Sequence, residues 1–391
     1  MRVGLPWVSE AGAIGGNGRR PGPPGCRVVG IGTAVPGTRV SNSEIESFLD
    51  TSDEWIQSRT GIRERRVAEP ELTLLELAAR AAKAALAAAE VEPASVDAII
   101  CSSSSPDATF PSLACRLQAE LGCPHGPAFD VQAACSGSLY GLGLAQAMIQ
   151  SGLSRTVLVV AAEIFSRVLD WNDRSTAVLF GDGAGAFLVG GPDRSGAEVV
   201  ALDLGADGGG AWALDTIRYR PPQGESANSL PGYASSARAL DRVVHMDGRE
   251  VFRFSTKILE QIVHRLVGAA GIEPGAIALF VPHQANSRIL ATAAGRLGVP
   301  FERFACNVDR LGNTSSASIP LALAEAERQG RCHDGELVCL VAFGAGLTWG
   351  GALLRWQPTG VVIDDPVALE SNLRMVGPPA RTPQERKEVP E

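Results

Sequence analysis

The chain has 391 residues, of which 45% are hydrophobic and 20% charged, and its formal net charge at pH 7 is −8. The acidic balance excludes binding to nucleic acid through a long basic surface, and the length allows two or three domain-sized units with large cores. The eight cysteines form no CxxC pair, which is typical of reduced thiols in the cytoplasm rather than of disulfides or a metal site. Because no apolar run reaches about 18 residues and the N-terminus lacks an apolar signal core, we expect neither a membrane span nor secretion.

Strand-like and helix-like patterns alternate between two polar ends that contain many prolines. Residues 1–26 are rich in Gly, Pro and Arg, and we expect them to be disordered; residues 357–391 are expected to form a tail beyond the fold. Between these ends, residues 27–32 and 97–102 are short β-like runs, and residues 73–89 form an Ala/Leu-rich helix. This alternation predicts an α/β fold in which helices cover buried sheets.

The second half of the chain repeats the first. VEPASVDAII at 91–100 aligns with IEPGAIALFV at 272–281. TVLVVA at 156–161 aligns with ELVCLV at 336–341 at nearly the same offset, and AGAFLV at 184–189 resembles GGALLR at 350–355. Three matches in the same order indicate an internal duplication. We therefore expect two similar α/β halves, residues 27–200 and 201–356, packed face to face.

Cys135 is the candidate nucleophile. It lies in DVQAACSGSLY at 130–140, where an extended segment gives way to small residues and then to an apolar helical pattern. This places Cys135 beside a helix N-terminus, whose exposed N–H groups and positive dipole end favour a thiolate. A free cysteine is more commonly a buried structural residue, and that is our interpretation of Cys101, Cys115 and Cys339.

His283 and Asn313 are the candidate partners of this nucleophile. His283 follows the repeated strand of the second half, and open α/β sheets place their sites at such strand ends, although a packed core histidine is the alternative. Asn313 lies in LGNTSSASIP at 311–320, which taken alone is typical of a helix N-cap. This segment occupies, in the second half, the position of the Cys135 turn in the first. The duplication therefore brings both turns to one pseudo-symmetric centre.

Two glycine-rich turns complete the pattern, GDGAG at 181–185 and AFGAGLTWGG at 342–351. Neither has the spacing of a dinucleotide-binding or P-loop motif. The second follows a strand, so its backbone N–H groups are suited to stabilise a developing oxyanion.

From about Arg27 to Trp356 the chain resembles the β-ketoacyl-acyl carrier protein synthase III family of the thiolase superfamily. The resemblance implies a duplicated thiolase-like αβαβα fold, a homodimer, and no cofactor or metal. The motifs that carry it, besides the Cys135 turn and GDGAG, are TSDEWI at 51–56, RTGIR at 59–63, FPS at 110–112, HQAN at 283–286, GNTS at 312–315 and FGAG at 343–346.

The resemblance implies a two-step reaction. Cys135 takes an acyl group from acyl-CoA, and malonyl-acyl carrier protein is then decarboxylated and condensed onto it. His283 and Asn313 donate hydrogen bonds to the enolate, and the backbone N–H groups of Cys135 and Ala345 form the oxyanion hole.

The resemblance also assigns binding residues. A ring and a guanidinium, Trp55 and Arg174, are suited to hold the adenine of coenzyme A, although a packed aromatic is the alternative for Trp55. Phe110 closes the partner subunit's acyl pocket, or is a simple dimer-core aromatic. The remaining implied substrate-binding residues are Arg59, Phe252, Asn286 and Phe343, and the residues implied to dock the acidic carrier protein are Arg249, Arg253, Arg288 and Arg296.

Departures from the family pattern leave a second function open. Ala345 replaces the usual Gly of the oxyanion turn, Arg249 a smaller polar residue, and Gln132 a frequent Ala. A relative that transfers acyl groups to a hydroxyl or amine in secondary metabolism, without decarboxylation, is therefore the alternative. A papain-like cysteine protease shares the order Cys, His, Asn but lacks any duplication. A non-catalytic partner subunit usually lacks the nucleophile, which is present here.

Overall fold

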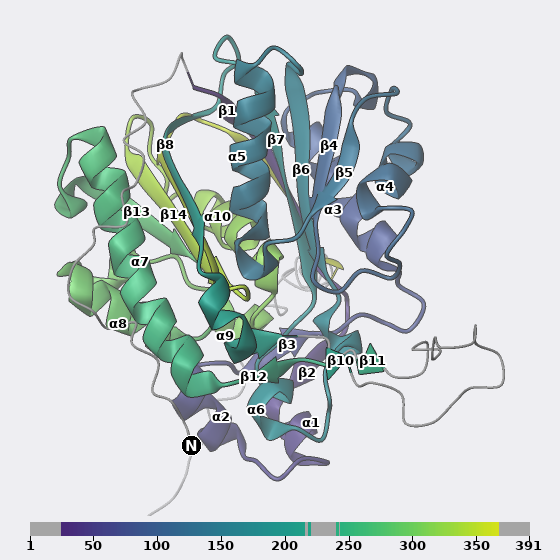
Figure 1. Ribbon diagram of the computed structural model, residues 1–391, viewed down its shortest axis with the longest axis vertical. Helices are drawn as coiled ribbons and strands as arrows, with labels where there is room; N and C mark the ends of the chain where they lie inside the picture. Colours follow the sequence, from purple (N-terminus) through teal and green to yellow (C-terminus); the bar gives the residue numbers. More distant parts are fainter. Residues whose placement is uncertain (1–24, 216–217, 220–239, 242, 367–391) are drawn as a thin grey trace, which may run out of the picture.

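The computed structural model describes residues 25–215, 218–219, 240–241 and 243–366. Within these residues a mixed ten-stranded sheet runs through the whole molecule (Figure 1). In their order across the sheet, the strands are β13 (Ile277–Pro282), β14 (Leu337–Gly344), β15 (Thr348–Arg355), β8 (Ala197–Ala206), β1 (Arg27–Ala34), β7 (Gly183–Gly190), β6 (Thr156–Glu163), β4 (Ala98–Ser102) and β5 (Ala128–Val131), with β16 (Gly360–Asp364) paired to β1. The two halves of the chain meet where β1 pairs with β8.

Helices lie on both outer faces and between the halves (Figure 1). Helices α3 (Leu74–Ala88) and α4 (Leu113–Leu121) share one apolar core with β4, β6 and β7. Helices α7 (Gly248–Ala270) and α8 (Ser287–Leu297) share another with β13, β14 and β15. The central layer, α5 (Gly137–Gln150) and α10 (Ser318–Arg328), packs in a third core against strands of both halves. The predicted αβαβα fold class is confirmed.

Short elements gather at one end of the layers, the lower end in Figure 1. The antiparallel pair β2–β3 and helix α2 come from the first half, and α9 from the second. Their bounds, with those of the other short strands and helices, are β2 (Arg39–Ser41), α1 (Asn42–Glu46), α2 (Asp53–Thr60), β3 (Glu64–Arg66), α6 (Arg174–Ala177), β9 (Leu214–Asp215), β10 (Arg218–Tyr219), β11 (Leu240–Asp241), β12 (His245–Met246) and α9 (Val308–Leu311).

The duplication is visible element by element. The strands β6 and β14 begin at Thr156 and Leu337, so the sequence alignment, which paired Thr156 with Glu336, was displaced by one position. The short 3₁₀ turns η2 (Ala134–Ser136) and η7 (Ser315–Ala317) are separated by the same interval as these two strands. Their first residues, Ala134 and Ser315, have positive φ angles of 46° and 49°. The halves therefore repeat an uncommon backbone conformation as well as the order of elements.

The helix expected at 73–89 is α3, and its small residues explain its close approach to the sheet. Thr73 caps it by accepting a hydrogen bond from the Glu76 N–H. A Cβ on Gly32 of β1 would lie 2.1 Å from the Ala85 backbone nitrogen, so strand and helix need both a glycine and an alanine-rich face. This packing of small residues positions β1 at the centre of the sheet.

Both expected boundaries of the second half differ from the structure. Residue 201 falls inside β8, which begins the second half at Ala197. The fold also continues beyond Trp356, because β16 pairs with residues 30–34 of β1 and Asp364 pairs with Arg80. Residues 1–24, part of the segment expected to be disordered, lie outside the described residues. Of the two described residues of that segment, Gly25 and Cys26, Cys26 is buried, and its carbonyl accepts a hydrogen bond from the Val199 N–H. The expected tail beyond Pro366 lies outside them too.

In the part of the chain that is described, no helix is both long and apolar enough to cross a membrane. The same residues contain no group of three or more His, Cys, Asp or Glu side chains that could hold a metal ion.

The ion pair between Arg66 and Asp365 should stabilise the end of the fold. The Arg66 side chain is 3% exposed and lies 3.0 Å from Asp365, so Asp365→Asn leaves a buried guanidinium without its counter-charge. We expect a loss of about 2 kcal/mol in the free energy of unfolding, measured by urea denaturation. The control Glu120→Gln breaks the exposed pair with Lys83 (3.1 Å) and should cost less than about 0.5 kcal/mol. Equal losses would show that Asp365 contributes no more than a surface charge.

Candidate active site

A pocket of about 350 Å³ brings Cys135, His283 and Asn313 together. The volume is within the usual range of small-molecule sites. Cys135 comes from the first half, whereas His283 and Asn313 come from the second, so neither half has a complete site. The pocket also contains six of the residues that the family resemblance implied, and these are Trp55, Arg59, Arg174, Phe252, Asn286 and Phe343.

Cys135 is held at the start of α5. Strand β5 ends at Val131, the 3₁₀ turn η2 follows, and α5 begins at Gly137, as the sequence pattern predicted. The side chain is 6% exposed, and its Sγ lies 3.4 Å from Ser315 Oγ. The turn is also fixed by Gln132, whose Nε2 donates to the Ser103 carbonyl while its Oε1 accepts from the Ala134 N–H. The nucleophile candidate is therefore both buried and rigidly placed.

Burial makes Cys135 a thiol at rest. It raises the pKa of the Cys135 thiol to about 12, while the contact with Ser315 lowers it and the nearby Glu163 raises it further. Such a rise corresponds to about 4 kcal/mol, whereas the positive end of a helix contributes at most about 2 kcal/mol. Desolvation therefore outweighs the dipole of α5, and it favours the thiol over the thiolate expected from the sequence.

His283 follows β13 and is 2% exposed. Burial lowers its pKa to about 3, so the imidazole is neutral. Its Nδ1 lies 2.7 Å from Ser318 Oγ, which accepts from the Gln284 backbone N–H at 3.4 Å. The Ser318 hydroxyl proton is thus directed at Nδ1, which leaves Nε2 protonated as a hydrogen-bond donor. Phe343 packs edge-on against the ring with its centroid at 5.2 Å.

Asn313 is oriented by the next turn of the chain. Its Oδ1 accepts a hydrogen bond of 2.9 Å from the Ser315 N–H, and its backbone is tied to Leu179 and Gly181. Because Oδ1 is engaged, Nδ2 is the atom available to donate. Asn313 does not cap α10, whose N-cap is Ala317, so the helix-cap interpretation of this residue was wrong.

The glycine-rich turn after β14 lies against the nucleophile. A Cβ on Gly344 would lie 2.6 Å from the Cys135 backbone nitrogen, so only glycine permits this approach. The next residue, Ala345, does not have a positive φ angle. In the described chain, the non-glycine residues that do are Glu90, Ala134 and Ser315. The replacement of the usual glycine by Ala345 is therefore compatible with the local backbone.

The residues implied to bind coenzyme A lie at the mouth of the pocket. The Arg174 guanidinium lies 4.8 Å from the centre of the Trp55 ring and also donates to the Asp50 carbonyl. Arg288, which the resemblance assigned to carrier-protein docking, lines the pocket as well, with its guanidinium 5.7 Å from the Phe252 ring. Asn286 also caps α8, because its Oδ1 accepts from the Ile289 N–H.

Other implied residues lie outside this pocket. Phe110 is 84% exposed. The other three docking arginines, Arg249, Arg253 and Arg296, lie on α7 and α8, and two of them pair with acidic side chains of α7, Arg253 with Glu250 and Arg296 with Glu260.

The sequence interpretation was wrong about one cysteine and missed three polar residues. Cys101 and Cys339 are buried, as predicted, but Cys115 is exposed on α4. Ser315 and Ser318 support Asn313 and His283, and both were inside the quoted GNTSSAS segment. Glu163 is completely buried at the end of β6. An acidic residue that ends an otherwise apolar strand was the signal that could have identified it.

Comparison with known proteins gives consistent matches. Models of 3-oxoacyl-[acyl-carrier-protein (ACP)] synthase III match residues 129–208 and, for the C-terminal part of that family, residues 267–356. A β-ketoacyl-[acyl-carrier-protein] synthase III of Symbiobacterium thermophilum is 45% identical over 329 residues, which are 84% of this chain and 97% of the relative. The 3-oxoacyl-[acyl-carrier-protein] synthase III structure from Aquifex aeolicus has a TM-score of 0.76 and 39% identity, covering 85% of this chain and 100% of that chain. A priming β-ketosynthase from a polyketide biosynthetic pathway has a TM-score of 0.75 and 36% identity, covering 89% and 99%.

The αβαβα layers, with a cysteine, a histidine and an asparagine meeting in one pocket, define a condensing enzyme of the thiolase superfamily. Within this class, the chain belongs to the β-ketoacyl-acyl carrier protein synthase III family. It is an acyltransferase that initiates fatty acid or polyketide chains. The papain-like protease alternative is thereby excluded.

Proposed function

We propose that the enzyme takes an acyl group from acyl-CoA onto Cys135 and condenses it with malonyl-acyl carrier protein by decarboxylation. The observation that carries this proposal is the meeting of Cys135, His283 and Asn313 in one pocket. The reaction requires no cofactor or metal, because the cysteine supplies the nucleophile and carbon dioxide loss supplies the carbanion.

In the first half-reaction the Cys135 sulfur attacks the thioester carbonyl. The backbone N–H groups of Cys135 and Ala345 hold the resulting oxyanion. The support for this assignment is the close approach of the turn at Gly344 to the Cys135 nitrogen. The leaving group is the thiolate of coenzyme A.

In the second half-reaction His283 and Asn313 stabilise the enolate. Decarboxylation places negative charge on the malonyl thioester oxygen, and two neutral donors, His283 Nε2–H and Asn313 Nδ2–H, are suited to receive it. The pKa of His283, lowered to about 3 by burial, keeps the ring neutral, so no proton is transferred before the charge develops. Ser318 and Ser315 hold the two donors in place before substrate arrives.

Coenzyme A binding requires Arg174 to move. Its distance of 4.8 Å from the Trp55 ring is that of a direct cation–π contact, which leaves no space for a third planar group. We propose that adenine enters between them and that Arg59, at the same mouth, contacts the coenzyme. Trp55 then stacks on the adenine ring instead of on the Arg174 guanidinium.

The carrier protein is proposed to dock on α7 and α8. Arg249, Arg253, Arg288 and Arg296 lie there and attract an acidic partner, mainly by raising the rate of association. Arg288 also reaches the pocket, which connects the docking surface with the entrance.

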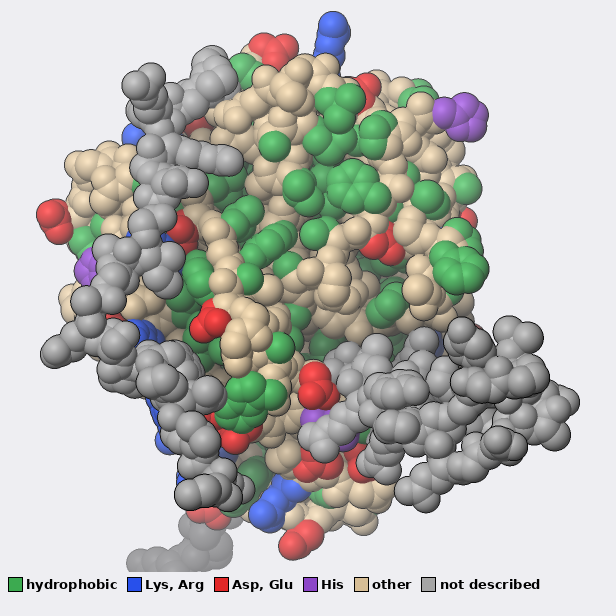
Figure 2. Space-filling model, in the orientation of Figure 1, with side chains coloured by type: hydrophobic (Ala, Val, Ile, Leu, Met, Phe, Trp, Pro, Cys, Tyr) green, Lys and Arg blue, Asp and Glu red, His purple; other side chains and the backbone are tan. Residues whose placement is uncertain are grey.

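A homodimer in the cytoplasm is the proposed state of the enzyme. Hydrophobic side chains gather on the face over α5 and β8 (Figure 2), where Leu144 and Leu204 are 37% and 40% exposed. Exposed hydrophobic side chains gathered on one face are typical of a subunit interface. Phe110, which is 84% exposed, is proposed to reach from one subunit into the acyl pocket of its partner.

Transfer to a hydroxyl or amine remains the second candidate. Ala345 and Gln132 fit the local backbone of the site, so two of the departures from the family pattern give no structural reason for a different acceptor. The presence of both His283 and Asn313 favours condensation, because acyl transfer alone requires no enolate stabilisation.

Cys135 should be the one cysteine that acyl-CoA acylates. Cys135→Ala removes the nucleophile, so incubation with acyl-CoA should add no acyl mass to the intact protein, while circular dichroism stays unchanged. The control Cys115→Ala removes an exposed thiol and should leave the added mass intact. Acylation of the Cys135→Ala variant at the wild-type rate would falsify the proposed nucleophile.

Replacing His283 or Asn313 by Ala should lower malonyl decarboxylation about 10²- to 10³-fold, the usual cost of one oxyanion donor. Acylation of Cys135 should decrease less, because it uses the backbone oxyanion hole. The two half-reactions are measured separately, by carbon dioxide release and by intact mass. The exposed His125, between α4 and β5, is the matched control, and His125→Ala should leave both rates unchanged. Condensation that survives both site substitutions would favour transfer to a hydroxyl or amine.

Phe110 should restrict the acyl group to acetyl to butyryl length, because a filled pocket does not accept further methylenes without strain. Phe110→Ala should shift the preference to longer primers, by up to about 0.8 kcal/mol for each added methylene. A chain-length series of kcat/KM for both proteins measures the shift, with Phe301→Ala, a 40% exposed aromatic on another surface, as the control. A wild-type preference for primers of eight or more carbons, or an unmoved profile, would contradict this role.

A further inference from the structure

The GDGAG turn at 181–185 contains a buried carboxylate that the proposed reaction does not use. Asp182 lies between Gly181 and the first residue of β7, and it is 0% exposed. A buried carboxylate is stable only where hydrogen-bond donors replace its lost contact with water. The donors that surround Asp182 therefore show which parts of the chain it holds together.

Two separate segments donate hydrogen bonds to this carboxylate. The Ala68 N–H, in the loop after β3, donates to Oδ2 at 2.7 Å. Ser166, in the 3₁₀ turn η3 (Phe165–Arg167), donates from its N–H to Oδ1 at 2.9 Å and from its hydroxyl to Oδ2 at 2.6 Å. The Asp182 N–H also donates to the Arg66 carbonyl at 2.8 Å. Both carboxylate oxygens are thus engaged, and Asp182 is fixed to both segments.

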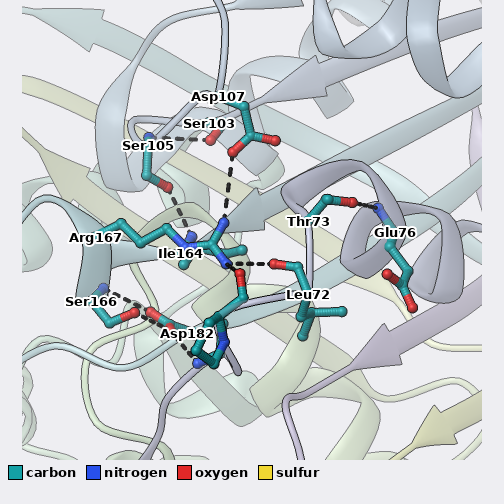
Figure 3. Close-up of polar contacts among 12 residues, drawn as sticks. Leu72, Thr73, Glu76, Ser103, Ser105, Asp107, Ile164, Ser166, Arg167 and Asp182 are labelled. Atoms are coloured by element: carbon teal, nitrogen blue, oxygen red, sulfur yellow. Dashed lines mark hydrogen bonds and ion pairs between the residues drawn. The ribbon is translucent and has the colours of Figure 1, made fainter.

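The two segments are also tied to each other, as Figure 3 shows beside Ser166 and Asp182. The Arg167 guanidinium donates to the Leu72 carbonyl at 2.6 Å and to the Glu69 carbonyl at 3.2 Å. These bonds connect η3 with the loop after β3 independently of the carboxylate. Asp182 is therefore bound to one connected support rather than to two loops that move separately.

On its other side, the segment that ends at Asp182 holds Asn313. The Asn313 N–H donates to the Leu179 carbonyl at 2.9 Å, and the Gly181 N–H donates to the Asn313 carbonyl at 3.1 Å. These two bonds form an isolated parallel bridge. The backbones are also in close contact, because a Cβ on Gly181 would lie 2.2 Å from the Leu311 carbonyl oxygen. The chain between Leu179 and Asp182 therefore cannot shift without moving the backbone of Asn313.

The position of Asn313 matters because its side chain lines the pocket and its Nδ2–H is proposed to stabilise the enolate. The Ser315 N–H fixes the rotation of the amide group, whereas the bridge to residues 179–181 fixes the backbone from which the side chain extends. A displacement of about 1 Å at a reacting centre costs about 10²-fold in rate. The bridge, and whatever holds it, should therefore affect decarboxylation.

Building on the function proposed above, we propose that Asp182 is a positioning residue for decarboxylation, which acts by fixing the backbone of Asn313. Asp182 itself does not line the pocket. Its effect is selective, because the turn that carries Cys135 is held by other contacts, among them the hydrogen bond from Gln132 to the Ser103 carbonyl. Asp182 thus supports the second half-reaction and not the first.

The test uses Asp182→Asn, which keeps the shape of the side chain and replaces one acceptor oxygen by an NH₂ group. At saturating malonyl-acyl carrier protein, carbon dioxide release should fall about 10- to 10²-fold. This loss is smaller than that of Asn313→Ala, because a displaced donor keeps part of its interaction. Acylation of Cys135 by acetyl-CoA, read by intact mass, should stay within about threefold of the wild type, since it needs no enolate donor. Equal losses in both half-reactions, or no loss in either, would overturn the proposal.

A double variant separates positioning of Asn313 from damage to the whole pocket. If Asp182 acts through Asn313, adding Asp182→Asn to Asn313→Ala should lower decarboxylation no further. If the substitution instead disturbs the pocket as a whole, the two losses should multiply, and this result would contradict the proposal.

Asp97→Asn is the matched control. Asp97 lies beside the start of β6, at the opposite end from the residue that pairs with Gly183. Its carboxylate accepts from the backbone N–H groups of Arg155 and Thr156 at 2.7 and 3.0 Å, and its own N–H donates to the Thr156 carbonyl. The substitution removes the same kind of contact and should leave both half-reactions unchanged. A selective loss of decarboxylation here too would show that the effect is not specific to Asp182, and the proposal would fail.

Ser166→Ala provides a second variant, because it removes the hydroxyl donor and leaves the carboxylate in place. We expect the same selective loss of decarboxylation, about threefold to tenfold, since the two N–H donors remain. If Asp182→Asn does not fold, an unselective loss or unchanged rates in Ser166→Ala would overturn the proposal. Wild-type decarboxylation in Asn313→Ala would refute the proposed function and the positioning role together. A loss in Asn313→Ala without one in Asp182→Asn would refute the positioning role alone.

Discussion

The active site depends on the close contact of two buried turns, η2 from the first half and η7 from the second. Each begins with a non-glycine residue at positive φ, Ala134 and Ser315, a conformation that persists only where surrounding packing compensates its cost of about 1–3 kcal/mol. Space around the turns is minimal. A Cβ on Gly137 would lie 1.8 Å from Ser102 Oγ, and one on Gly344 would lie 2.6 Å from the Cys135 nitrogen. The central layer of α5 and α10 and the register between the two halves of the sheet are what bring these turns together.

The same burial sets the electrostatics of the proposed reaction. Desolvation raises the pKa of Cys135 to about 12 and lowers that of His283 to about 3, so both side chains are uncharged when substrate arrives. A neutral His283 donates a hydrogen bond to the enolate without transferring its proton. Such a donor is suited to stabilise charge that appears only in the transition state. The cost is that Cys135 is not spontaneously ionised. A water-excluding site that favours the second half-reaction therefore disfavours the thiolate that the first one requires.

The sequence was sufficient to predict the fold class and three residues of the pocket because a duplication constrains both. VEPASVDAII and IEPGAIALFV identified corresponding strands, and this correspondence placed Cys135 and Asn313 at one centre. Features that depend on three-dimensional packing were not predictable. The exposed position of Cys115 follows from which face of α4 meets the sheet, and the thiol state of Cys135 follows from desolvation. The pairing of β16 with β1 was missed because a five-residue edge strand among prolines has the composition of a tail.

The asymmetry of the duplication explains why one turn reacts and the other does not. Residues at corresponding positions of the two halves are chemically different. Cys135 corresponds to Ser316, and Ser102 corresponds to His283. Glu163, at the end of β6, corresponds to Gly344 at the end of β14. Over η7, the carboxyl of Glu163 fills the space beside Ser316 and bonds its hydroxyl. Over η2, Gly344 contributes no side chain, and a Cβ there would lie 2.6 Å from the Cys135 backbone nitrogen and 3.1 Å from Ala134 Cβ. A side chain at position 344 would therefore displace the backbone of the reactive turn, whereas Glu163 lies beside a turn that receives no substrate in the proposed reaction. One half thus contributes the open reactive turn, and the other contributes the closed polar turn that supports it.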